Sequence, residues 1–167
     1  VCARDRAGAL VQLEDSLRRL RTDVIDLWMF HECNQPGDPN LVFREAGALE
    51  AALEARRQGK VRFIGFTGHK SPAVHAALVE GAFAWDAVLM PLNVADAHHD
   101  SFTRRVLPLC LERDIAVIAM KSLGGTREIV EGAPVSIEEC LRYSMGLNVS
   151  VLISGMDNAR KMRANME

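Results

Sequence analysis

Residues 15–31 read DSLRRLRTDVIDLWMFH, and the clearest architectural signals of the chain lie in this segment. The first part of this segment, residues 15–20, belongs to a longer stretch over residues 8–20. Leucines recur there every three or four positions, the spacing of an amphipathic helix. Residues 24–30 are mostly apolar and predict a strand. His31 follows directly where that strand ends. The segment therefore predicts a helix, a strand and a polar side chain in that order.

The same alternation continues along the chain. Further helices are expected over 45–58, 72–80, 101–113 and 136–145, further strands over 61–66, 86–92, 115–120 and 149–154, and a last helix near Asn158. Most of these strands are continuous apolar runs, which predicts burial on both faces of a parallel sheet. Strands that begin every ~25–40 residues leave room for a crossover helix between them. Two α/β architectures fit this pattern: an open doubly wound sheet and a (β/α) barrel.

Composition excludes several classes of protein. The chain has 167 residues, 20 Lys+Arg and 22 Asp+Glu, so its formal net charge is −2 and no basic face for nucleic acid is expected. No apolar run approaches the ~20 residues of a membrane helix, and no secretory signal is visible. The four cysteines form no Cys-x-x-Cys pair, so we expect reduced thiols, a cytoplasmic protein and no structural zinc site. Without a visible linker, residues 1–167 are expected to form a single domain.

Polar residues follow the predicted strands, where both architectures collect their ligands. They are His31 with Glu32, Thr67 to His69, Asn93, Lys121 to Gly125, and Ser154 with Gly155. Asn93 has a second interpretation as a turn former, and Lys121 has one as an ordinary surface lysine. Asp96 to Asp100 holds possible metal ligands, but neighbours in one loop rarely converge on an ion, so we expect no metal site.

These motifs resemble those of the aldo-keto reductases. Residues 15–31 resemble the segment that enters the fourth barrel strand of this family and ends in its active-site histidine. Residues 59–66 resemble the fifth strand, 117–125 the seventh, and 153–156 with Asn165 the eighth strand and its cofactor helix. The resemblance covers essentially the whole chain. It implies a (β/α)8 TIM barrel that is incomplete, with about five of its eight βα units present.

The resemblance also implies an activity. The parent protein would be an NAD(P)H-dependent oxidoreductase that reduces an aldehyde or ketone, a small-molecule carbonyl, by hydride transfer. His31 would be the catalytic histidine that hydrogen-bonds the carbonyl oxygen, whereas the family's tyrosine, aspartate and lysine would precede Val1. We therefore expect a C-terminal fragment that does not turn over alone. Its open sheet edges and apolar faces predict poor solubility or self-association.

The cofactor-binding residues are expected from the same resemblance. They are Thr67, Asn93, Lys121, Ser122, Leu123, Gly155, Met156, Lys161 and Asn165. Gly155 would let the backbone approach the nucleotide phosphates, Lys161 would lie near the adenosine phosphate, and Asn165 would hold the adenine. The adjacent cations Arg160 and Lys161 favour NADP over NAD, although a solvated basic stretch on a surface helix is the alternative interpretation.

Two other functions stay open at this level. Lys121 stands at a strand end, where its amine could form the Schiff base of a barrel lyase. Alternatively, the scaffold could bind a nucleotide as a non-catalytic sensor or subunit. Borohydride trapping on Lys121 would favour the first alternative, and NADPH binding without NADPH consumption would favour the second.

Overall fold

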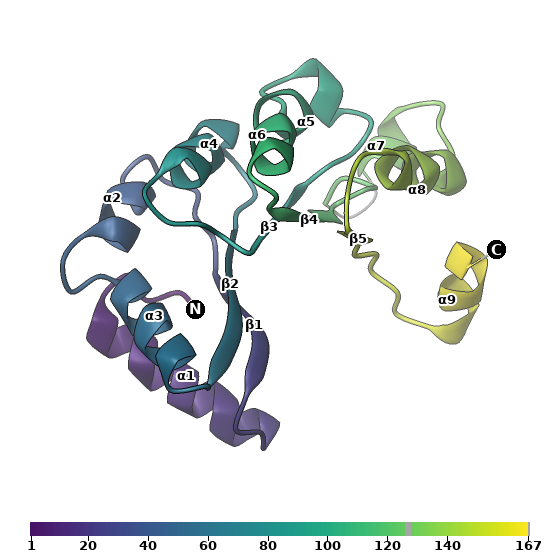
Figure 1. The fold of residues 1–167 in the computed structure, drawn as a ribbon. Coiled ribbons are helices and arrows are strands. Elements are labelled where there is room, and N and C mark those ends of the chain that lie inside the picture. The colour runs from purple at the N-terminus through teal and green to yellow at the C-terminus, as the bar shows by residue number, and fades with distance from the viewer. Residues whose placement is uncertain (126–127, 167) are drawn as a thin grey trace.

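Five parallel strands form one sheet in the order in which they occur along the chain. They are β1 (Ile25–Phe30), β2 (Val61–Thr67), β3 (Ala87–Pro91), β4 (Ala116–Met120) and β5 (Val151–Leu152). The structure is a computed structural model that describes residues 1–125 and 128–166. In a doubly wound sheet the strand order reverses at a switch point, whereas here it never reverses, so the architecture is the incomplete barrel. Figure 1 shows the sheet as an open arc with helices along its outer side.

The helices connect successive strands, as parallel pairing requires. They are α1 (Arg6–Leu20), α2 (Asp38–Phe43), α3 (Ala48–Arg57), α4 (Pro72–Glu80), the 3₁₀ turn η1 (Asp96–His98), α5 (Phe102–Arg105), α6 (Leu107–Glu112), α7 (Glu128–Gly132), α8 (Ile137–Gly146) and α9 (Ala159–Met166). Side-chain caps start several of them: Asp5 accepts from the Gly8 amide, and Ser71 accepts from the Val74 amide. The capping box of Ser136 and Glu139 at the start of α8 is confirmed.

Several elements differ from the sequence prediction. The helix expected over 101–113 is divided at Val106, because Pro108 lacks the N–H that a continuous helix would use and its ring crowds the preceding turn. Between His31 and residue 45 the sequence predicts no helix, but α2 begins at Asp38 with Pro39 in its first turn. The last strand, expected over 149–154, is reduced to Val151–Leu152.

Burial differs between the two faces of the sheet. The residues that face the helices are buried, namely Trp28, Phe30, Ile64, Phe66, Val88, Met90, Val117 and Ala119. On the inner face, the register pairs Leu27 with Phe63 and Ile118 with Val151, and Phe63 and Val151 are each 52% exposed. The predicted burial on both faces is therefore wrong for this chain, since the helices in Figure 1 cover only the outer side.

Aromatic rings fill the core between the first strands and their helices. Trp85 lies 4.9 Å from Phe66 and 5.8 Å from Phe30, measured between ring centroids. The His75 ring lies between Phe66 and Phe102, with centroid distances of 5.0 Å to each. Such packing leaves few voids and holds the strands rigidly beneath their carboxyl ends. Within the described residues, no helix combines the length and apolar character needed to cross a bilayer.

Candidate active site

The carboxyl ends of the first four strands bring the predicted polar residues to one edge of the sheet. His31 follows β1, Thr67 ends β2, and Lys121 follows β4. The rings of His31 and His69 lie 6.3 Å apart between centroids, nearly perpendicular to each other. The charge of Lys121 is close enough to act on His69. Residues far apart in sequence therefore meet at this edge, as the parallel topology requires.

The loop after β1 is held by an ion pair. The Nε atom of Arg4 donates to the carboxylate of the buried Asp38 at 3.1 Å, and the same guanidinium donates to the backbone oxygens of His31 at 2.8 Å and Glu32 at 3.2 Å. Asp38 also accepts from the backbone amides of Asn34 and of the residue after it. Charge-assisted hydrogen bonds of this kind are stronger than neutral ones. They fix the backbone on which the exposed His31 ring stands.

Hydrogen bonds connect the loop after β2 to the loop after β1. The Cys33 amide donates to the Thr67 carbonyl at 2.8 Å, and the His69 amide donates to the Asn34 side chain at 2.7 Å. A Cβ on Gly68 would come within 2.5 Å of the Cys33 carbonyl oxygen. Only glycine therefore fits between the two loops. Partial burial, and then the charge of Lys121, lower the pKa of His69, whose Nδ1 is buried without a hydrogen-bond partner among the described residues.

Two buried groups beside this edge have distinct chemistry. The Thr67 hydroxyl oxygen is buried and makes no hydrogen bond within the part of the chain that the structure describes. Such a group is costly to leave unpaired, which makes it a candidate contact for a bound ligand. Burial raises the pKa of the Cys33 thiol to about 11, so this thiol stays protonated and is a poor nucleophile.

The residues after β3 and β4 build two interlocked turns. The Asn93 side-chain nitrogen donates to the Lys121 carbonyl at 3.1 Å, while its oxygen accepts from the amides of Ala95 and Asp96. Asn93 thus acts as the turn former that the sequence left open. Lys121 has a φ of 58° and an exposed side chain, and Ser122 is buried. Leu123 is half-buried beside them.

The remaining predicted cofactor residues lie after β5. Gly155 and Met156 are exposed on the extended segment between β5 and α9, and α9 stands apart from the first four strands in Figure 1. The Lys161 ammonium pairs with Asp157 at 2.6 Å, and the Asn165 side-chain nitrogen donates to the Ser154 hydroxyl at 3.0 Å. Among residues 1–125 and 128–166, no hydrogen bond or ion pair joins this segment to His31, Thr67 or Lys121.

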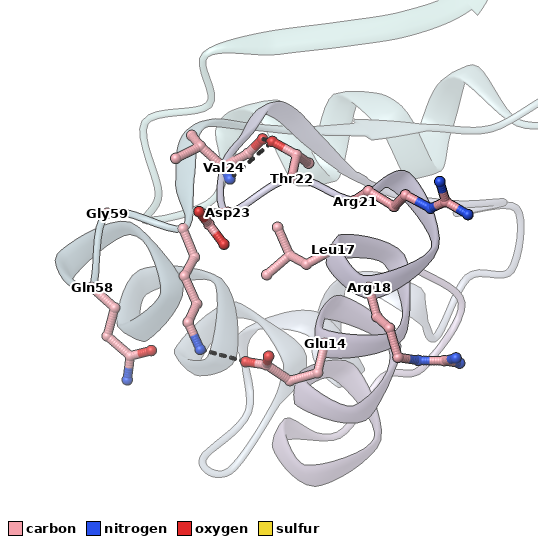
Figure 2. A pocket seen from close by; sticks show the side chains of 10 residues that line it. Glu14, Leu17, Arg18, Arg21, Thr22, Asp23, Val24, Gln58 and Gly59 are labelled. Carbon is pink, nitrogen blue, oxygen red and sulfur yellow. Dashed lines mark hydrogen bonds and ion pairs between the residues drawn. The ribbon is translucent and has the colours of Figure 1, made fainter.

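A cavity of about 660 Å³ lies at the opposite end of the first two strands. Residues before β1 and β2 line it (Figure 2), and the Lys60 ammonium donates a hydrogen bond to the Glu14 carboxylate. The amino end of a strand is the end that contributes to stability in barrels, whereas chemistry lies at the carboxyl end. This cavity is therefore distinct from the predicted site.

The ion pair of Arg4 and Asp38 was not predicted from the sequence, because the two residues are 34 positions apart and belong to no common motif. The only local signal is the acid at the start of α2, a usual first-turn residue. In the loop that sequence reasoning weighed as a metal site, Asp96 accepts from the amides of Phe102 and Thr103 at 2.8 Å. That carboxylate therefore anchors the start of α5.

Comparisons with known proteins agree on one family. The family model described as "Aldo/keto reductase family" matches residues 4–128. "Aldo-keto reductase family 1 member C1" of Macaca fuscata fuscata is 24% identical over 93% of the chain and 57% of its own length. "6-dehydroglucose reductase" of Novosphingobium aromaticivorans is 30% identical over 69% of the chain and 35% of its own length. The matched part of the chain thus spans 57% of the first relative and 35% of the second.

Solved structures show the same fold. The holo form of an aldo-keto reductase from Bacillus halodurans aligns with a TM-score of 0.75 and 20% identity, over 96% of this chain and 60% of that one. An aldo/keto reductase from Brucella melitensis aligns with a TM-score of 0.71 and 19% identity, over 99% and 63%. At these identities the likeness supports the incomplete barrel and leaves the site to be argued from its own residues.

Proposed function

The chain belongs to the aldo/keto reductase family, and from this premise we propose that the protein carrying it reduces an aldehyde or ketone with a nicotinamide cofactor, NADP in preference to NAD. We also propose that the chain is the carboxyl-terminal part of a single barrel domain. The coverage of 57% of a curated relative supports the second statement. The gathering of His31, Thr67 and Lys121 at the carboxyl edge supports the first.

His31 would position the carbonyl group. Its exposed ring stands at the end of β1 on a backbone that Arg4 holds through two oxygens. A ring N–H that donates to the carbonyl oxygen would orient the substrate and stabilise the negative charge that develops there. A rigid donor does this best, because no reorganisation is needed as the charge forms. The contacts of Arg4 therefore serve the same step.

The residues around Thr67 fit a polar cofactor group. The buried Thr67 hydroxyl, which has no hydrogen-bond partner among the described residues, would form a hydrogen bond with the carboxamide or ribose of the cofactor. The exposed Lys121 would pair with a phosphate. When bound, the cofactor supplies the hydride. Lys161 and Asn165 would reach the adenosine end only by exchanging their present partners, Asp157 and Ser154.

The Schiff-base alternative has less support. A lysine that forms Schiff bases is activated by an apolar pocket or a second cation nearby. The Lys121 side chain is exposed instead. No observation favours the lyase over the reductase.

Cofactor binding tests the proposal without relying on turnover. Calorimetric titrations of the chain with NADPH and with NADH should show tighter binding of NADPH. Thr67→Val should weaken NADPH binding about tenfold, the effect of losing roughly one hydrogen bond. Thr22→Val, at the amino end of β1, is the matched control and should bind like the unchanged chain. No NADPH binding, or an equal effect of the two variants, would contradict the proposed role of the carboxyl edge.

A further inference from the structure

Three side chains that commonly bind transition metals converge at the carboxyl edge. One potential ligand atom from each of His31, Glu32 and His69 lies within 4.8 Å of those from the other two. We propose that these three residues form a binding site for a divalent transition metal of the zinc class. The site is separate from the Asp96 loop that the sequence offers, and it draws its ligands from two loops rather than one.

The backbone explains how two neighbours can face one ion. Consecutive residues of an extended chain point to opposite sides, so His31 and Glu32 would ordinarily diverge. Glu32 instead has a φ of 55°, in the left-handed region that few non-glycine residues adopt. Glu32 therefore departs from the extended conformation, and one ligand atom of its carboxylate lies within 4.8 Å of one of the His31 imidazole. The guanidinium of Arg4 holds this segment through the backbone oxygens of both residues.

The third ligand comes from the neighbouring loop. The amide of His69 donates to the side chain of Asn34 at 2.7 Å, which fixes this residue relative to the loop after β1. Its Nδ1 is buried without a hydrogen-bond partner among the described residues. The Glu32 carboxylate, for its part, makes no ion pair within residues 1–125 and 128–166. Both groups therefore have free coordinating capacity.

The ligand set suits zinc. Two imidazoles and one carboxylate, with a fourth position open to water, form one of the recurring zinc environments. Ligand atoms on one tetrahedral zinc ion would be roughly 3.4 Å apart, from bonds of about 2.1 Å. Because His31 and Glu32 are exposed and His69 is half-buried, rotation of the side chains can bring the ligand atoms towards that spacing.

Two neighbours modulate the site. The sulfur of Cys2 lies 3.6 Å from Nδ1 of His31, so this thiol is an additional soft group beside the ligands. The ammonium of Lys121 lies close enough to act on His69 and opposes a bound cation. Zinc held here would occupy the ring that the proposed reduction needs, so in the reductase it would act as an inhibitor. That consequence depends on the proposed function, whereas metal binding itself does not.

The experiment titrates the chain with ZnCl₂ in a Cys2→Ser background, which removes the extra thiol. Calorimetry should give one site, and His69→Asn should weaken zinc binding at least tenfold. Glu32→Gln should weaken it by about the same factor, and Lys121→Met should tighten it because an opposing charge is lost. His98→Asn, an exposed histidine outside the cluster, is the matched control and should bind unchanged. Circular dichroism of each variant without metal verifies the fold.

Imidazole ¹⁵N spectra locate the ion directly. Zinc should shift the ring nitrogens of His31 and His69 and leave those of His98 and His99 in place. Equal affinity of His69→Asn and the background chain would overturn the proposal, as would shifts confined to His98 and His99. Loss of zinc binding in the Cys2→Ser background alone would overturn the three-residue ligand set. None of these results depends on NADPH binding or on turnover, so they separate this proposal from the reductase.

Discussion

At the scale of single residues, the site depends on groups that do not themselves meet a substrate. Arg4 holds the backbone of His31, Asp38 holds Arg4, and both side chains are largely buried, at 15% and 9% exposure. Removing one partner of a buried pair leaves the other charge uncompensated, which costs more than an exposed pair contributes. Substitution of Arg4 should therefore loosen the conformation of the loop after β1.

Arg4→Met should lower the free energy of unfolding by roughly 1–3 kcal/mol, because Asp38 loses its cationic partner. Urea denaturation measures this change, and hydrogen exchange should show faster exchange of the amides in residues 31–35. Arg62→Met removes an ion pair with Asp26 in which both side chains are exposed. The free energy of unfolding of this variant should stay within about 0.5 kcal/mol of that of the unchanged chain. Equal losses in the two variants would show that the buried pair contributes nothing specific.

His75 should make stability depend on pH. Burial lowers its pKa from 6.5 to about 4. The folded chain therefore keeps the ring neutral at pH values where the unfolded chain binds a proton. The stability from this ring is fully present above pH 6.5 and is lost as the pH falls towards 4, with a total of up to about 3 kcal/mol.

Urea midpoints between pH 7 and pH 4 measure the slope. His75→Leu should flatten the slope in this range, whereas His98→Gln, at an exposed position, should keep it. A slope that is unchanged in His75→Leu would assign the acid sensitivity to other groups.

At the scale of elements, the alternation of helix and strand was predictable because amphipathic spacing, apolar runs and caps are local signals. All five predicted strands and the capping box of α8 are present. The apolar runs by themselves do not reveal whether a second layer covers the inner face. Its exposure was predictable only from the incomplete barrel that the family resemblance implies. The ion pair of Arg4 with Asp38 and the ring contact of His69 with His31 form only in the tertiary structure. A single sequence carries no local signal for either.

The loop that follows β2 shows why one element needs a glycine. A Cβ on Gly68 would come within 2.5 Å of the Cys33 carbonyl oxygen and 2.6 Å of Cε1 of His75. Gly68→Ala should therefore cost roughly 1–3 kcal/mol and displace His69 from His31. Gly146→Ala, at a helix position where a Cβ meets nothing within 4 Å, should be neutral or slightly stabilising. Thermal unfolding compares the two, and an unaffected Gly68→Ala would show that the two loops can separate freely.

At the scale of the whole molecule, the helices cover only the outer side of the sheet and leave apolar side chains of its inner face exposed. Phe63 and Val151 are each 52% exposed there, and Ile153 is 50% exposed. In a closed barrel such side chains fill the interior. Left open, this face should associate with the same face of another copy.

Sedimentation velocity should therefore show association of the chain that increases with concentration. Phe63→Lys should shift the distribution towards monomer, because a charge on the inner face cannot be buried against a second copy. Leu20→Lys, on α1 and 65% exposed, is the control and should leave association unchanged. A monomer at every concentration would contradict the expected association.

The most direct measurement concerns His31 in the longer protein of which we propose this chain is a part. We expect this protein to oxidise NADPH when it is supplied with an aldehyde. We expect His31→Gln to lower kcat about 10²–10³-fold, the effect of losing one donor to a developing oxyanion. His98→Gln should retain the full rate. Turnover that is undiminished in His31→Gln, with the fold intact, would contradict the account.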